Sequence, residues 1–382
     1  MASPTPLGLY LHIPFCSAIC NYCNFNRGLY DADVKARYVV ALAEEIRRRG
    51  DGHPADSVFF GGGTPSLLAP RDVAVLLDAC RAGFALAGDV EVTLEANPES
   101  VSVASLRGYR EAGVNRLSFG AQSFRDEELR RLSRLHSAGR VESAVGEARE
   151  AGYDNLSLDL MMWLPGQSVA EWLASVDALV RLGPEHASMY MLEIYPNAPL
   201  RDEMARGRWV VAPDDDVAEM YEQGLAILDA AGYRQYEISN AAYPGRESRH
   251  NLKYWTDGEW CGFGAGAHST RRGVRSRNVS SVSDYLAAVG GEGPLEAERR
   301  ELTPEERVEE ALFTGLRVAA GLDLQIIENR YGLDVWAEFG GELQPFVDQG
   351  LLIYDGAAVR LTRPGMLLAH EVMAVFIRSS VR

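Results

Sequence analysis

The chain has 382 residues, of which 47% are hydrophobic and 24% are charged, and its formal net charge is -16. This balance is typical of a soluble globular protein with room for one large domain and a smaller one. The acidity and the lack of a clustered Lys/Arg stripe argue against a general nucleic-acid binder, which needs cations against the phosphates.

The first residues contain neither the basic leader nor the apolar run of a secretory signal. No window reaches the roughly 20 apolar residues that a membrane helix needs. We therefore expect a cytoplasmic protein with reduced thiols and no transmembrane segment.

From residue 7 to about residue 195, short apolar runs alternate with amphipathic stretches, which is typical of repeated βα units. The expected strands are Leu7–Ile13, Ser57–Gly62, Val90–Glu95, Asn115–Gly120, Asn155–Met162 and His186–Ile194. The expected helices are Asp33–Arg49, Arg71–Ala85, Val103–Glu111, Asp126–Leu132 followed by Ala138–Glu150, and Ala170–Leu182. Right-handed crossovers would curl these units into an α/β fold, a partial, TIM-like (β/α)6 barrel.

Three of the five cysteines, Cys16, Cys20 and Cys23, lie in the loop after the first expected strand. Soft thiolates in one tight group favour an iron-sulfur cluster. A zinc site usually takes four ligands in two pairs, and a structural disulfide needs an oxidising compartment. Three thiolates on a four-iron cluster would leave one iron open to a small molecule.

Glycines and polar residues follow the other expected strands, where the active sites of such barrels lie. They are Gly61, Gly62, Gly63 and Thr64 after the second strand, Glu95 and Asn97 at the third, Gln122 at the fourth and Asp159 at the fifth. Each has a structural explanation of its own, such as a tight turn, a helix cap or a surface carboxylate. Beside the cysteine loop, together they favour one shared pocket.

The last part of the sequence predicts a smaller C-terminal α+β domain that resembles a winged helix. Thr303 is expected to cap a helix that begins with Pro304, and Asp355-Gly356 joins two short apolar runs in a hairpin. We therefore divide the chain into a barrel (1–212), a barrel extension with an aromatic stretch (213–300) and a C-terminal module (301–382).

The C-x-x-x-C-x-x-C loop resembles the radical S-adenosylmethionine (SAM) superfamily. The segments HIPFC, GGGTP, LEANP, RLSFGAQSF, LPGQ and HNLKYW resemble the branch that contains oxygen-independent coproporphyrinogen III oxidase (HemN) and the HemW-type heme chaperones. Phe25 stands where the oxidase has a further cysteine, and residues 250–255 match the His-Asn-x-x-Tyr-Trp motif of the chaperones. The resemblance is therefore to the heme-chaperone side of this branch.

This resemblance implies a [4Fe-4S] cluster on Cys16, Cys20 and Cys23, with SAM at the fourth iron. The positions that match the first SAM site are Tyr10, Gly62, Gly63, Thr64 and Glu95; Tyr22, Gln122, Arg134 and Asp159 match positions around a second SAM in the oxidase, without establishing a second SAM here. Trp163 replaces a glycine that is usual in relatives, and its bulk is expected to narrow any second site.

The leading hypothesis is a cytoplasmic heme chaperone that passes heme to acceptor proteins. The heme contacts would come from His250, Asn251, Tyr254 and Trp255, with His268 as another candidate ligand; ordinary core packing is the alternative for these side chains. The cluster motif also fits an enzyme that acts through a 5′-deoxyadenosyl radical on a tetrapyrrole or another substrate, so enzymatic activity stays open and no catalytic residue is assigned. A redox sensor and a homodimer are further hypotheses.

Overall fold

The computed structural model describes residues 5–196, 198–206, 210 and 212–377. Six neighbouring strands of its largest sheet run parallel in the order of the chain. They are β1 (Leu7–Ile13), β4 (Pro54–Gly62), β5 (Ala85–Ala96), β6 (Arg116–Gln122), β7 (Leu156–Met162) and β8 (His186–Met191). The predicted α/β partial barrel is confirmed.

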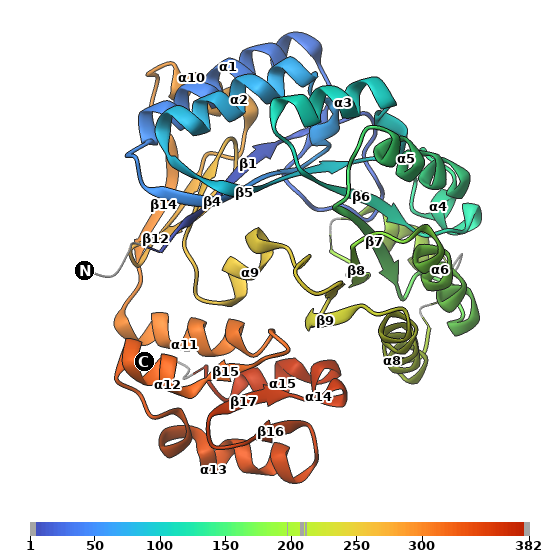
Figure 1. Cartoon of the computed structure of the whole chain (residues 1–382), viewed down its shortest axis with the longest axis vertical. Coiled ribbons are helices and arrows are strands. Elements are labelled where there is room, and N and C mark those ends of the chain that lie inside the picture. Colours follow the sequence, from blue (N-terminus) through green and yellow to red (C-terminus); the bar gives the residue numbers. More distant parts are fainter. Residues whose placement is uncertain (1–4, 197, 207–209, 211, 378–382) are drawn as a thin grey trace.

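Helices α1 to α6 connect these strands and cover one face of the sheet (Figure 1), and α7 and α8 follow β8. They are α1 (Ala32–Arg49), α2 (Pro70–Gly83), α3 (Val103–Ala112), α4 (Asp126–Arg131), α5 (Ala138–Glu150), α6 (Val169–Leu182), α7 (Pro199–Ala205) and α8 (Asp214–Ala230). Two single 3-10 turns, Pro65–Leu67 and Pro98–Ser100, follow β4 and β5.

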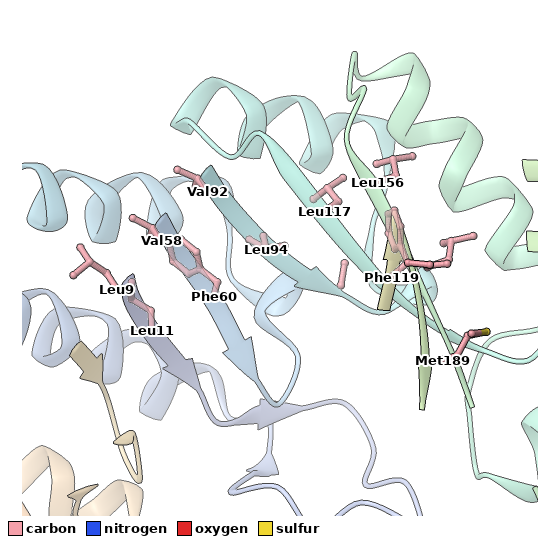
Figure 2. Close-up of a cluster of buried hydrophobic side chains, with 14 of the residues drawn as sticks. Leu9, Leu11, Val58, Phe60, Val92, Leu94, Leu117, Phe119, Leu156 and Met189 are labelled. Atoms are coloured by element: carbon pink, nitrogen blue, oxygen red, sulfur yellow. The ribbon is translucent and has the colours of Figure 1, made fainter. Parts of the chain in front are cut away.

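Alternation along the strands separates the core from the barrel interior. Leu9 and Leu11 of β1 are fully buried and pack with Val58 and Phe60 of β4 (Figure 2). Because successive side chains point to opposite faces of a sheet, Tyr10 and His12 face the other way, into the barrel. The same alternation therefore builds the core and supplies the polar interior.

The sheet continues at both edges beyond the six parallel strands. On one side, β11 (Trp260–Phe263) pairs parallel with β1 and is followed by antiparallel β12 (His268–Arg271), β13 (Val274–Asn278) and β14 (Glu296–Glu301). On the other side lie β10 (Asn240–Ala242) and β9 (Arg234–Glu237). Helix α10 (Val282–Val289) packs against α1.

The C-terminal part combines helices with a small antiparallel sheet. The helices are α11 (Pro304–Gly315), α12 (Leu324–Tyr331), α13 (Val335–Asp348), α14 (Arg363–Leu367) and α15 (Ala369–Ala374), and the strands are β15 (Leu322–Asp323), β16 (Leu352–Tyr354) and β17 (Ala358–Leu361). The Thr303 cap and the hairpin of β16 and β17 match the predictions. The division at residues 212 and 300 stays a prediction.

Helix α9 (Arg249–Trp255) lies between the barrel sheet and the C-terminal part (Figure 1), where it contacts β4 and α11. Within the described ranges, no helix combines the length and the hydropathy that crossing a bilayer requires.

Candidate functional site

A cavity of about 430 Å³ opens where the parallel strands end. This volume falls in the usual range of cofactor pockets, about 300–1,000 Å³. The residues predicted for the cluster and for SAM that line it are Cys16, Cys20, Tyr22, Cys23, Gly62, Gly63, Thr64, Glu95, Gln122, Arg134 and Asp159. The structure thus brings together the polar ends of five strands.

The cysteine loop is fixed by backbone hydrogen bonds on both sides of its thiols. Strand β2 (Phe15–Cys16) pairs with β3 (Gly28–Leu29), and the Thr64 amide donates to the Phe15 carbonyl at 2.7 Å. All five cysteines are free. The loop therefore holds its shape through the sheet, without a disulfide.

The donor set of this loop fits a four-iron cluster. Burial raises the pKa of the Cys16 and Cys23 thiols, so their thiolates need a positive partner. Among the described residues, no three His, Cys, Asp or Glu side chains are arranged to hold one metal ion. A [4Fe-4S] cluster instead takes one thiolate at each of several irons, and the three thiols line one wall of the same cavity.

Two glycines let the end of β4 approach the cysteine loop. A Cβ at Gly63 would lie 2.7 Å from the Phe15 carbonyl oxygen, and one at Gly62 would lie 2.5 Å from the His12 ring. Gly62 also has φ +114°, which side chains rarely allow. His12 in turn bonds the Asn26 carbonyl through Nε2 at 2.7 Å, so it anchors the far end of the loop.

Two of the carboxyl groups that line the cavity, those of Glu95 and Asp159, have raised pKa values. Burial and the neighbouring Asp159 raise the pKa of Glu95 to about 8, although the Gly62 amide donates to its Oε2 at 3.2 Å. Burial also raises the pKa of Asp159, which accepts from Ser118 Oγ at 3.2 Å. A cationic ligand would offset the cost of ionising either group.

Arg134 reaches the cavity from the turn after α4. Its Nη2 donates to Asn97 Oδ1 at 2.7 Å and to the Gly120 carbonyl at 2.9 Å, and its Nη1 lies 3.6 Å from Cys20 Sγ. Asn97 also donates to Thr64 Oγ1 at 3.1 Å. The sequence places Asn97 at a strand end but gives it no role; its place between Thr64 and Arg134 is visible only in three dimensions.

The histidine of the His-Asn-x-x-Tyr-Trp motif lies outside the cavity, below its floor. His250 is buried, and its ring stacks near Phe59 and Tyr10 with centroids 5.2 and 6.3 Å away. Its Nδ1 bonds Ser57 Oγ at 3.0 Å and its Nε2 bonds Tyr254 Oη at 2.9 Å. Burial lowers the pKa of His250 to about 3, so the ring is neutral and both nitrogens have partners.

The other motif residues point toward neighbouring elements. Asn251 Nδ2 donates to Tyr236 Oη at 3.4 Å, and the Arg317 guanidinium lies 4.3 Å from the Trp255 ring centroid. Tyr10, between this layer and the cavity, bonds His12 Nδ1 at 3.1 Å. His268 is exposed on β12. The motif thus joins the barrel floor to the C-terminal part.

Trp163 does not narrow the cavity, which corrects the expectation from the sequence. Its indole Nε1 donates to the Ala212 carbonyl at 3.0 Å, and the ring packs on the edge of the core. The side chain is absent from the cavity wall that the described residues form. Its backbone keeps a left-handed φ of 62°, the conformation that a glycine would adopt without strain.

Comparison with known proteins agrees with this geometry. Residues 10–179 match the Radical SAM superfamily, and residues 302–368 match the HemN C-terminal domain. The heme chaperone HemW of Bacillus subtilis (strain 168) is 38% identical, over 96% of this chain and 98% of that protein. The chain belongs to the HemW family of radical SAM proteins. Membership of the radical SAM superfamily implies SAM and a [4Fe-4S] cluster.

Other relatives of this HemW-family chain extend the comparison. The mitochondrial radical S-adenosyl methionine domain-containing protein 1 of Bos taurus is 38% identical, over 97% of this chain and 88% of that protein. The solved structure of Escherichia coli coproporphyrinogen III oxidase (HemN), a radical SAM enzyme, superposes with a TM-score of 0.85 at 24% identity, covering 98% of this chain and 91% of that one. This superposition shows the shared fold.

Proposed function

We propose that this HemW-family protein is a cytoplasmic heme chaperone, which binds heme and passes it to acceptor proteins. Cys16, Cys20 and Cys23 would hold the [4Fe-4S] cluster in the cavity, and SAM would lie beside it. The identity to heme chaperones along nearly the whole chain supports this proposal.

The cavity wall suits the parts of SAM. Gly62, Gly63 and Thr64 line the cavity, so backbone groups and one hydroxyl would face a ligand there. Glu95 would accept from an ammonium or hydroxyl group and would ionise when the cationic ligand binds. Tyr10 would support this wall from below, and Tyr22, Gln122 and Asp159 would face the remaining space. When bound, the cluster and SAM supply one-electron chemistry.

The observation that carries the heme proposal is an apolar rim around the mouth of the cavity. This rim consists of Phe25, Tyr190 and Met191, which line the cavity and are still 65%, 43% and 48% exposed. Grouped, exposed apolar side chains mark binding surfaces, and the flat faces of a porphyrin need such contacts. We therefore place heme on this rim.

The sequence-based proposal that His250, Asn251, Tyr254 and Trp255 contact heme requires a different conformation. To ligate iron, His250 would have to give up its bond to Ser57 or to Tyr254 and leave a buried site. Heme on the rim would leave His250 in its buried site. The two placements therefore predict different effects of His250→Ala on heme binding.

Heme titration of the anaerobically reconstituted protein, followed by the Soret band, tests the proposal. Binding should weaken in Phe25→Ser and persist in His250→Ala. A wild-type protein that takes up no heme would contradict the chaperone function.

An enzyme is the second candidate, favoured by two carboxyl groups on the cavity wall, Glu95 and Asp159, whose pKa values are raised by burial. An anaerobic assay with dithionite would measure 5′-deoxyadenosine and the decarboxylation of coproporphyrinogen III. Product formation over many turnovers would show that the protein is an enzyme. Heme uptake without product formation would support the heme chaperone.

A further inference from the structure

We propose that Arg134 is a positioning residue of the cluster: held by Asn97, it donates a hydrogen bond to the Cys20 sulfur and raises the reduction potential of the cluster. This inference rests on the proposed cluster binding. It gives Arg134 a task other than holding a second SAM.

The guanidinium of Arg134 is held in one orientation. Both protons of Nη2 have acceptors, the side-chain oxygen of Asn97 and the carbonyl oxygen of Gly120. Because the guanidinium is planar, these two bonds also fix the direction of Nη1, which lies 3.6 Å from Cys20 Sγ. The Tyr22 side chain also lies beside this guanidinium, and Nε is buried without a hydrogen-bond partner.

Asn97 is itself fixed, so that its oxygen faces Arg134. Its Nδ2 donates to Thr64 Oγ1 at 3.1 Å, and its backbone amide donates to Ser66 Oγ at 3.2 Å. A flipped amide would turn the NH2 group toward the guanidinium, donor against donor. The Asn97 side chain therefore links the end of β4 to Arg134 through one hydrogen bond on each side.

The cysteine loop and the Arg134 turn are also joined directly. Asn21, next to Cys20, donates to the Arg131 carbonyl at 2.8 Å, and the Arg134 amide donates to the Leu129 carbonyl at 2.9 Å. Cys20 and Arg134 are thus tied to the same end of α4. This keeps the sulfur and the guanidinium at a defined separation.

The expected consequence is electrostatic. Reduction adds negative charge to an iron-sulfur cluster, and part of that charge resides on its sulfur ligands. A partly buried cation that donates to one of these sulfurs stabilises the reduced form more than the oxidised form. Removing the cation should therefore make the cluster harder to reduce.

The test is a redox titration of the reconstituted full chain, followed by electron paramagnetic resonance. Arg134→Gln should shift the midpoint potential to a more negative value, and Asn97→Ala, which keeps the charge but loses the anchor, should shift it less in the same direction. Arg130→Gln is the matched control, since Arg130 carries the same charge but is exposed on α4; its potential should equal that of the wild type.

Iron and sulfide content separates this inference from the proposed function. A wild-type chain that takes up no iron would overturn the cluster assignment itself. A fully loaded Arg134→Gln protein with the wild-type potential, or one that loses one of two bound SAM molecules at unchanged potential, would overturn the inference alone. If Arg134→Gln takes up no cluster, the midpoint potential of Asn97→Ala tests the inference: an unchanged potential would overturn it.

Discussion

His250 Nε2 and Tyr254 Oη lie 2.9 Å apart on successive turns of α9, while Ser57 occupies the other ring nitrogen. Two residues of the His-Asn-x-x-Tyr-Trp motif, His250 and Tyr254, are therefore hydrogen-bonded to each other inside the protein. Their neighbours Tyr10 and Phe59 extend this layer toward the cavity. The motif therefore lies beneath the cavity that we propose as the SAM site.

His250→Ala should therefore mainly affect stability. The change removes a buried ring and leaves Ser57 and Tyr254 without a partner, which together should cost about 2–4 kcal/mol in the free energy of unfolding. Denaturant unfolding measures this loss, and Tyr254→Phe, which removes one hydroxyl, should cost about 1 kcal/mol. Normal stability of His250→Ala combined with a lost or shifted Soret band would instead identify His250 as a heme ligand.

Glu95 predicts a specific dependence of stability on pH. Its pKa is about 8 in the folded chain and near 4.5 when exposed, so between these values the folded chain holds a proton that the unfolded chain has lost. Its contribution to stability is therefore complete below pH 4.5 and is lost as the pH rises toward 8. In SAM-free protein, the melting temperature of Glu95→Gln relative to wild type should rise between pH 5 and pH 8. A constant difference over this range would contradict the raised pKa.

The six parallel strands could be predicted from the sequence because each is a short apolar run between turn residues and amphipathic helices. Leu7–Ile13 and Ala138–Glu150 have the predicted bounds. Strand β11 was missed because its partner is β1, some 250 residues earlier, and no local pattern encodes that pairing. Strand β14, Glu296–Glu301, is charged and exposed at the sheet edge, so it lacks the apolar pattern of a strand.

The cavity was predictable for a related reason: residues at the carboxyl ends of neighbouring parallel strands must meet. The directions in which individual side chains point could not be predicted from the sequence. Trp163 turns its indole to Ala212, and His250 turns its ring into the barrel, and both directions depend on tertiary contacts. The exposed rim of Phe25 and Met191 likewise depends on which side chains remain uncovered after folding.

The three loop cysteines should be required for the cluster, and the core cysteine should not. Cys16→Ala should lose most of the bound iron and sulfide and the visible absorbance of the cluster, because it removes one thiolate from the cavity wall. Cys80→Ala is the control: this thiol is buried in the core, away from the cavity. Equal iron content in the two variants would argue against the assignment of the loop.

Trp163→Gly should leave SAM affinity unchanged, because the indole does not line the cavity. The unfolding free energy should fall by about 1–2 kcal/mol, since lost packing and the lost bond to Ala212 outweigh the relief of the left-handed backbone. Calorimetric titration with SAM and denaturant unfolding measure the two effects. Tighter SAM binding in the variant would contradict this prediction and would indicate that Trp163 obstructs the cavity.

The most direct test of the account is the dissociation constant of heme for reconstituted wild type, Phe25→Ser and Ile326→Ser. Ile326 is a suitable control because its side chain, on α12 of the C-terminal part, is 59% exposed, close to the exposure of Phe25. Phe25→Ser removes an aromatic ring that bound heme would cover, and this loss should weaken heme binding at least about tenfold. Heme binding to Ile326→Ser should equal that of the wild type. Equal affinity of all three proteins for heme would contradict heme binding on the rim.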